Sequence, residues 1–153
     1  ADIDLAAVVR AVAEEHQPAA ADKHVQLRIE GPTPFPATSD RELLHQLLGN
    51  LLSNAIRYNR LGGTVTIGLV SLSDDRMRLT IQDTGIGIPT EHQARIFERF
   101  YRIDAHRSRQ SGGTGLGLAI VKHLVGTLRG SISFVSTADG TTFTVDLPRR
   151  AKN

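Results

Sequence analysis

The sequence has no cysteine, no long apolar segment and only a small excess of positive charge. The absence of cysteine excludes a disulfide framework and a thiolate metal site, and it suits a reducing compartment. No apolar run approaches the roughly 18 residues of a membrane-spanning helix, so no membrane span is expected. The formal charge of +2 is too small to argue for binding to nucleic acid.

What remains is the composition of an ordinary folded domain. The 153 residues, of which 40% are apolar and 22% charged, fit a single domain with a hydrophobic core. Asp2 and Asp4 stand where a secretory signal would carry basic residues, so no signal peptide is expected. The chain contains neither an internal repeat nor a low-complexity tract.

The segment SGGTGLGLAIV, residues 111–121, is unusually rich in glycine and is followed by an apolar run with helical spacing. Glycine lets a backbone approach a ligand closely. The start of a helix also offers free N–H groups and a positive dipole end to a phosphate. The same glycines would suit a tight turn with close helix packing. The segment alone therefore leaves phosphate binding and a purely structural turn equally open.

Two common phosphate-binding motifs do not fit this glycine segment. The P-loop requires lysine followed by serine or threonine after its last glycine, and no glycine here precedes such a pair. The dinucleotide motif requires G-x-G-x-x-G directly after a strand. Gly113, Gly115 and Gly117 are instead spaced G-x-G-x-G and follow a polar, basic segment. The loop therefore belongs to another kind of site.

Four stretches of the chain have the pattern of helices. Residues 3–15 carry an apolar stripe, with Asp2 or Asp4 as the cap, and Pro18 is expected to end that helix. The strongest pattern runs from Arg41 to about Tyr58, after Ser39 or Asp40 as the cap, and predicts a wide buried face. A short helix is expected over residues 91–100, and another from the glycine loop to about Leu128.

Alternating apolar and polar residues predict five strands and an irregular edge segment. The expected strands are residues 25–30, 64–70, 76–83, 131–137 and 141–147, and the proline-rich residues 31–40 are read as a turn with an edge strand. Two pairs of these strands form hairpins. Hairpins mixed with helices predict an α+β fold, a two-layer sandwich with helices on one face of a mainly antiparallel sheet.

The predicted central helix carries two asparagines among its apolar residues. Asn50 and Asn54 are four residues apart and so share one face of the helix. An amide beside a buried face needs a partner. The two could be ordinary surface amides, or an asparagine carbonyl oxygen could bind a hard cation such as Mg²⁺, which prefers oxygen ligands.

Two further segments combine polar, glycine and aromatic residues. In DTGIGIP, residues 83–89, a carboxylate at a strand end could accept a hydrogen bond from a ligand, although the segment could also be a simple turn. In IFERFYR, residues 96–102, three of the seven aromatic side chains gather, as in a small core under a loop. Five arginines between Arg95 and Arg109 form either a solvated basic face or a loop that meets a polyanion.

The order of these segments resembles the ATP-binding catalytic domain of sensor histidine kinases, in the wider superfamily that contains gyrase, Hsp90 and MutL. Residues 50–59 are similar to the N box, 83–89 to the first glycine box, 96–102 to the F box and 113–117 to the second glycine box. Each box is weak alone, but four in this order are specific. The resemblance covers essentially the whole chain, from about Leu5 to Pro148.

The resemblance implies a Bergerat-type fold over residues 1–153. It has a mixed, mostly antiparallel five-stranded sheet with about three helices on one face. It implies a nucleotide between the helices and a lid at about residues 101–112. The cofactors implied are ATP and Mg²⁺.

The resemblance also assigns roles to individual residues. Asp83 would accept the adenine amino group, and Tyr58 would stack on the base. Asn54 would bind Mg²⁺ and Asn50 would hold a phosphate or a metal-bound water. Arg57 stands where the family usually has lysine, and a planar guanidinium does not reproduce the contact of an ammonium point charge. Arg102 is the candidate for the γ-phosphate contact, with Arg107 and Arg109 as weaker candidates. The other residues expected to line the nucleotide are Gly85, Gly87, Ile88, Gly113, Thr114, Gly115, Leu116, Gly117 and Thr142.

The implied reaction is transfer of the γ-phosphoryl group to a histidine, for relay to an aspartate of a response regulator. Hydrolysing relatives have glutamate at the place of Asn50, and an asparagine cannot act as a general base, so slow hydrolysis is expected. None of the six histidines is followed by an acid, as the phosphoacceptor would be. The acceptor is therefore expected on a separate dimerisation domain, and this chain alone should bind ATP without phosphorylating itself.

The expected setting is a cytoplasmic domain of a protein anchored in the bacterial inner membrane, with no contact of its own with the membrane or with nucleic acid. Three other classes remain open. They are a conformational ATPase of the gyrase or Hsp90 kind, a stand-alone anti-sigma serine kinase, and a non-catalytic ATP-dependent interaction module. The first two would normally carry an acid at the place of Asn50.

Overall fold

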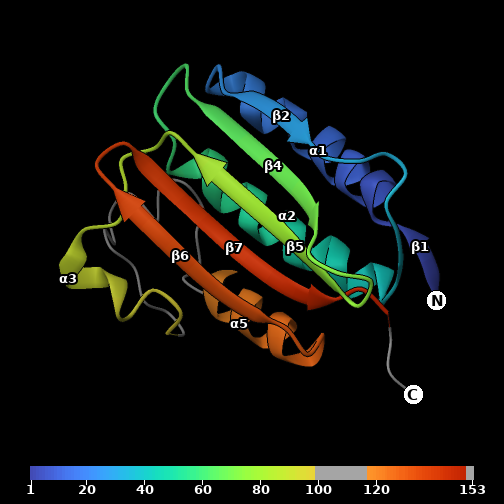
Figure 1. The fold of residues 1–153 in the computed structure, drawn as a ribbon. Helices are drawn as coiled ribbons and strands as arrows, with labels where there is room; N and C mark the ends of the chain where they lie inside the picture. Colours follow the sequence, from blue (N-terminus) through green and yellow to red (C-terminus); the bar gives the residue numbers. More distant parts are fainter. Residues whose placement is uncertain (99–116, 151–153) are drawn as a thin grey trace.

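The computed structural model describes residues 1–98 and 117–150. Figure 1 shows the course of the chain. The helices are α1 (Leu5–Asp22), α2 (Arg41–Arg57), α3 (Thr90–Gln93) and α5 (Gly117–Thr127). The strands are β1 (Asp2–Asp4), β2 (Gln26–Glu30), β3 (Pro36–Thr38), β4 (Thr64–Ser71), β5 (Arg76–Asp83), β6 (Ser131–Thr137) and β7 (Gly140–Pro148).

Five strands form one mixed sheet in the order β2-β4-β5-β7-β6. β2 runs parallel to β4, and every other neighbouring pair is antiparallel. The two predicted hairpins are the pairs β4–β5 and β6–β7. The predicted five-stranded, mostly antiparallel sheet is therefore confirmed.

Helices α1, α2 and α5 lie behind the sheet in Figure 1 and cover one of its faces. The core fills the space between these helices and the sheet, because strand residues alternate between buried and open positions. The largest fully buried side chains are Phe35, Leu5, Leu44, Leu47, Leu48, Leu51, Leu52, Ile67, Met77, Leu79, Ile81 and Leu147. The predicted two-layer α+β sandwich is confirmed.

Helix α1 is longer than the sequence predicts, because it continues through Pro18 to Asp22. Its cap is Asp4, whose Oδ1 accepts a hydrogen bond from the backbone N–H of Ala6 at 3.1 Å. Proline removes one helical hydrogen bond and usually ends or kinks a helix. Here the last turn is held by alanines, which favour helix, and by Ala20, whose side chain is fully buried.

Helix α2 begins after Asp40, which accepts a hydrogen bond from the backbone N–H of Leu43 at 3.1 Å. Of the two candidate caps, Asp40 is therefore the one used. The short helix expected over residues 91–100 is wrong in length, because α3 ends at Gln93 and turns follow as far as Phe97. A helix of four residues has one turn and few internal hydrogen bonds, so its end follows tertiary contacts rather than sequence pattern.

β1 and β3 pair as a two-stranded antiparallel ribbon. β3 lies within residues 31–40, where an edge strand is predicted, whereas β1 lies outside every predicted strand. Arg149 ties this ribbon to the main sheet. Its backbone N–H donates to Asp75 and its carbonyl oxygen accepts from Thr38, at 2.7 and 2.8 Å. Its guanidinium lies 4.5 Å from the ring centre of Phe35. Among the helices within residues 1–98 and 117–150, none is long and apolar enough to cross a bilayer.

Candidate functional site

Asp83 is the last residue of β5 and lies on the helix-covered face of the sheet, in step with the buried Met77, Leu79 and Ile81. Its Oδ1 accepts hydrogen bonds from the backbone N–H groups of Gly85 and Thr141, at 2.9 and 3.2 Å. Its second carboxylate oxygen has no hydrogen-bond donor within the described part of the chain. The side chain is thus fixed through one oxygen and leaves the other as an acceptor.

The surroundings of Asp83 raise the pKa of its carboxyl group above the ordinary value of 3.8. Burial is the main cause, because it penalises the charged form. The N–H groups of Gly85 and Thr141 act against it, since they stabilise the carboxylate. A half-buried carboxylate held in this way is typical of functional sites.

The loop after Asp83 passes so close to its neighbours that two positions require glycine. A β-carbon on Gly85 would lie 2.5 Å from the carbonyl oxygen of Tyr58. Gly87 has a φ of +77°, and a β-carbon there would collide with the carbonyl of Thr137. The loop is therefore pressed between the end of α2 on one side and the end of β6 on the other.

Beyond Gly87, the loop is bonded to the β6–β7 hairpin through two hydroxyl groups. The backbone N–H of Ile88 donates to Ser136 Oγ at 2.6 Å, and Ser136 Oγ lies 2.7 Å from Thr141 Oγ1. Because Thr141 also donates its N–H to Asp83, the β6–β7 hairpin holds both the loop and the Asp83 carboxylate in position.

The sequence prediction placed Thr142 at the site, and the structure does not bring it there. Thr142 pairs with Gln82 on the open face of the sheet, whereas Thr141 is buried on the helix side. The two residues point to opposite faces because side chains alternate along a strand. Thr141 therefore replaces Thr142, and Ser136 is a further contributor that the sequence reading missed.

Asn59 connects α2 to the segments beside Asp83 through its side chain, and the sequence does not predict this role. Its side chain is buried; Nδ2 donates to the carbonyl of Thr64 at 3.1 Å, and Oδ1 accepts from the backbone N–H of Arg60 at 2.8 Å. Thr84 Oγ1 also donates to Asn59 Oδ1, at 3.2 Å. An asparagine just beyond a helix C-cap, bonded to the next backbone N–H, is a local turn signal that could identify it.

The predicted residues Asn50 and Asn54 lie in the last two turns of α2, and the predicted Tyr58 follows the helix as its C-cap. Both asparagine side chains are half-buried, and neither amide hydrogen-bonds to another residue within the described ranges. Tyr58 is 36% exposed, and its carbonyl accepts from the backbone N–H of Ile86 at 3.5 Å. The structure thus brings Tyr58 against the Asp83 loop, with the two amides one and two turns earlier on the same helix.

Arg57 lies toward α1, where it helps to line a cavity of about 310 Å³. The other lining residues are His16, Ala19, Asp22, Lys23, Ser53 and Ile56. The ammonium group of Lys23 donates to the carbonyls of Arg57 and Asn59, at 2.7 and 2.9 Å. These bonds satisfy carbonyls that the end of α2 leaves free. The guanidinium of Arg57 makes no hydrogen bond or ion pair with any other described residue.

The F-box aromatic residue that the structure describes, Phe97, belongs to a small aromatic core. Its ring centre lies 6.0 Å from that of Phe134 and 6.4 Å from that of Phe143, both with edge-on geometry. Gly117 is the first residue of α5. Outside the described residues lie the predicted lid at 101–112 and the candidates Arg102, Arg107, Arg109, Gly113, Thr114, Gly115 and Leu116.

Residues 39–151 match the model of the family described as histidine kinase-, DNA gyrase B-, and HSP90-like ATPase. The sensor-like histidine kinase SenX3 of Mycobacterium tuberculosis is 41% identical over 152 residues, which cover 96% of this chain and 36% of that protein. The chain thus spans less than two fifths of the length of the curated relatives it matches.

Two solved structures share the fold along nearly the whole chain. The mycobacterial sensor histidine kinase MprB is similar with a TM-score of 0.83 and 27% identity, covering 99% of each chain. Full-length ShkA in complex with AMPPNP has a TM-score of 0.83 and 29% identity, covering all of this chain and 32% of that one.

Proposed function

Because the chain belongs to the family of histidine kinase-, DNA gyrase B- and HSP90-like ATPases, we propose that it is the ATP-binding catalytic domain of a two-component sensor histidine kinase. In this proposal it binds Mg²⁺-ATP and transfers the γ-phosphoryl group to a histidine on a separate dimerisation domain. The sensor histidine kinases among its relatives, SenX3 and MprB, support this choice within the family.

The observation that carries the proposal is the geometry of Asp83. One carboxylate oxygen is held by two backbone N–H groups, and the other is left as an acceptor beside a glycine loop. An adenine amino group is a donor that suits this oxygen. Guanine carries a carbonyl at the corresponding position and would leave the carboxylate without a donor, so the site should select adenine. Tyr58 would stack on the base.

The residues present on α2 fit a magnesium ion bound together with the nucleotide. Asn54 would supply one oxygen ligand and Asn50 would hold a phosphate or a metal-bound water, since neither amide is engaged elsewhere in the described ranges. Mg²⁺ usually takes few protein ligands beside phosphate and water. When bound, the ion would neutralise charge on the phosphates. Arg57, Arg102 and the glycines at 113–117 remain the candidates for phosphate contacts.

The proposed chemistry is transfer rather than hydrolysis. Phosphoryl transfer depends mainly on positioning and on neutralising charge, which amides, backbone N–H groups and arginines can supply. Hydrolysis is helped by a group that accepts a proton from water, and Asn50 cannot do this at neutral pH. The domain should therefore keep ATP until an acceptor histidine is presented. Rapid hydrolysis would instead favour a conformational ATPase of the gyrase or Hsp90 kind.

The acceptor and the later partners lie beyond this chain. None of its six histidines is followed by an acid, so the phosphoacceptor is placed on a dimerisation domain of the parent protein. From there the phosphoryl group would pass to an aspartate of a response regulator. The parent protein is proposed to be anchored in the bacterial inner membrane, with this domain on the cytoplasmic side.

The test is a calorimetric titration of the chain with Mg²⁺-ATP, beside the variants Asp83→Asn and Asp74→Asn. We expect one ATP per chain for the wild type. We also expect a loss of about 10- to 100-fold in affinity for Asp83→Asn, because a hydrogen bond to a charged acceptor is removed. Asp74 lies exposed in the β4–β5 turn and serves as the matched control. Equal binding by the wild type and Asp83→Asn, or equal binding of GTP and ATP, would contradict the proposal.

A further inference from the structure

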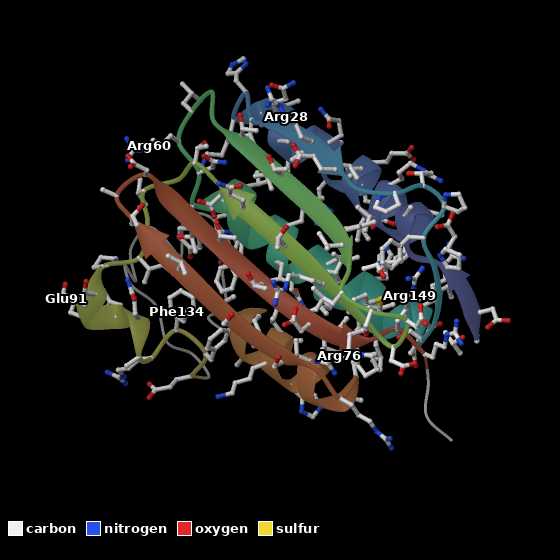
Figure 2. All side chains as sticks on the ribbon, in the orientation of Figure 1. Arg28, Arg60, Arg76, Glu91, Phe134 and Arg149 are labelled. Atoms are coloured by element: carbon white, nitrogen blue, oxygen red, sulfur yellow. The ribbon has the colours of Figure 1, made fainter. Side chains whose placement is uncertain are left out.

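Arg60 joins two segments near Asp83, the loop that follows β5 and the β6–β7 turn. Its Nη2 donates to the carbonyl of Ala138, in the β6–β7 turn, at 2.7 Å. Its Nε donates to the carbonyl of Gly85, in the loop after β5, at 3.4 Å. In Figure 2 the labelled Arg60 lies at the end of the molecule where the β6–β7 turn is found. One side chain therefore spans the outer rim of the candidate site.

The backbone from which Arg60 reaches is itself held in place. Its N–H donates to Oδ1 of the buried Asn59 at 2.8 Å, and Asn59 is bonded in turn to the carbonyl of Thr64. Gly63 packs so tightly below this turn that a β-carbon there would collide with the Asn59 side chain. A fixed starting point lets the planar guanidinium direct two donors at two separate carbonyls.

The bonds of Arg60 complement those on the inner side of the same loop. There, Ile88 donates to Ser136, and Ser136 contacts Thr141. These inner contacts act at the far end of the loop, whereas Arg60 acts at Gly85, two residues from Asp83. Since Gly85 also donates its N–H to Asp83 Oδ1, a shift of Gly85 would move a donor that orients the carboxylate.

We propose that Arg60 is a positioning residue for the base-binding half of the nucleotide site, holding Gly85 and the β6–β7 turn around Asp83. This inference rests on the proposed ATP-binding function. It assigns Arg60 no direct contact with phosphate, because two of its donors are already directed at backbone carbonyls. Removal of the Arg60 side chain should therefore lower the affinities for ATP and AMP by the same factor, since both nucleotides carry the same base.

The experiment compares Arg60→Ala, Arg60→Lys and Arg28→Ala. Arg28 is a matched control, because it is an exposed arginine on β2 whose guanidinium donates to Gln26 of the same strand. The affinities for ATP and AMP are measured by calorimetry or NMR titration, with Mg²⁺ present throughout, and the melting temperature is recorded for each variant. Arg60 is exposed, so its replacement should change the melting temperature little.

We expect Arg60→Ala to lower the affinities for ATP and AMP equally, by about fivefold to tenfold. This corresponds to the loss of two modest hydrogen bonds and of the positioning that they provide. The affinities of Arg60→Lys should lie between those of the wild type and of Arg60→Ala, because one ammonium group cannot replace both guanidinium bonds to the carbonyls of Gly85 and Ala138. Arg28→Ala should bind as wild type does.

Three results would overturn the inference. Unchanged affinities in Arg60→Ala would show that the two bonds do not position the site. A loss of affinity for ATP but not for AMP would show that Arg60 contacts the phosphates that only ATP carries. A loss of affinity matched by a large fall in melting temperature would mark a purely structural role. Asp83→Asn separates the two proposals: if it loses binding while Arg60→Ala does not, only the role of Arg60 fails. A wild-type chain that binds no nucleotide would remove both.

Discussion

Asp83 and Asp146 belong to the same sheet, but their surroundings shift the pKa values of their carboxyl groups in opposite directions. Burial raises the pKa of Asp83 above 3.8. The guanidinium of Arg78, which donates to both carboxylate oxygens of Asp146 at 2.7 and 2.9 Å, lowers the pKa of that carboxyl group. Only one oxygen of the Asp83 carboxylate has a donor in the described part of the chain, whereas both oxygens of Asp146 are bonded to Arg78.

A carboxyl-detected ¹³C NMR titration of the free chain should resolve this difference. We expect Asp83 to titrate above 3.8 and Asp146 below it. In Arg78→Ala the pKa of Asp146 should move up toward its ordinary value, while Asp83 should not change. A pKa at or below 3.8 for Asp83 would contradict the burial argument.

The same shifts determine how each residue affects stability. Between its ordinary and its raised pKa, Asp83 holds more protons in the folded state than in the unfolded state, so its contribution to stability falls as the pH rises through this window. Asp146 behaves in the opposite way. Its contribution is present above the unfolded pKa and is lost as the pH falls through the lowered pKa of the folded state.

For single residues, the sequence identifies those marked by their immediate neighbours in the chain, but not those whose role depends on partners far away in the chain. Asp83 could be predicted because it ends an alternating strand and precedes two glycines. The sequence predicts Thr142 at the site where the structure has Thr141, because the pattern does not fix which of two adjacent threonines faces the helices. A one-residue error along a strand moves the side chain to the other face of the sheet. Ser136 and Arg60 could not be predicted, since their partners lie 48, 25 and 78 residues away.

Among the elements, α1 continues well beyond the end that its sequence pattern predicts. Pro18 lies 13 residues into the helix, where it cannot donate to a preceding carbonyl, yet the helix continues to Asp22. The pattern could not show this, because the last turn depends on the burial of Ala20 and on Lys23, which follows the helix and donates to carbonyls at the end of α2. Tertiary contacts here outweigh a local stop signal.

We expect Pro18→Ala to raise the free energy of unfolding by about 1–2 kcal/mol. The missing helical hydrogen bond is restored, and the gain is partly offset by a more flexible unfolded chain. Urea unfolding of the wild type, Pro18→Ala and the nearby exposed control Gln17→Ala measures this. A variant no more stable than the wild type would show that α1 has already adapted to proline without cost.

For the whole molecule, the sequence predicted the class of fold and the count of strands in the main sheet. Alternation and hairpin turns carry that information locally. An edge strand is predicted within residues 31–40, where β3 lies. β1, its pairing with β3 and the attachment through Arg149 are not predicted, because a three-residue strand leaves almost no pattern and the paired segments are far apart in the chain. The β2–β4 pair is parallel and likewise lacks a turn signal that would reveal it.

The central claim is that Asp83 receives the base of a bound adenine nucleotide. The most direct test is a crystal structure of this chain with Mg²⁺ and a non-hydrolysable ATP analogue. The account predicts the adenine amino group within hydrogen-bonding distance of the free Asp83 oxygen, with Tyr58 against the ring and the phosphates toward Asn50 and Asn54. A base bound away from Asp83, for example in the cavity between α1 and α2, would contradict it.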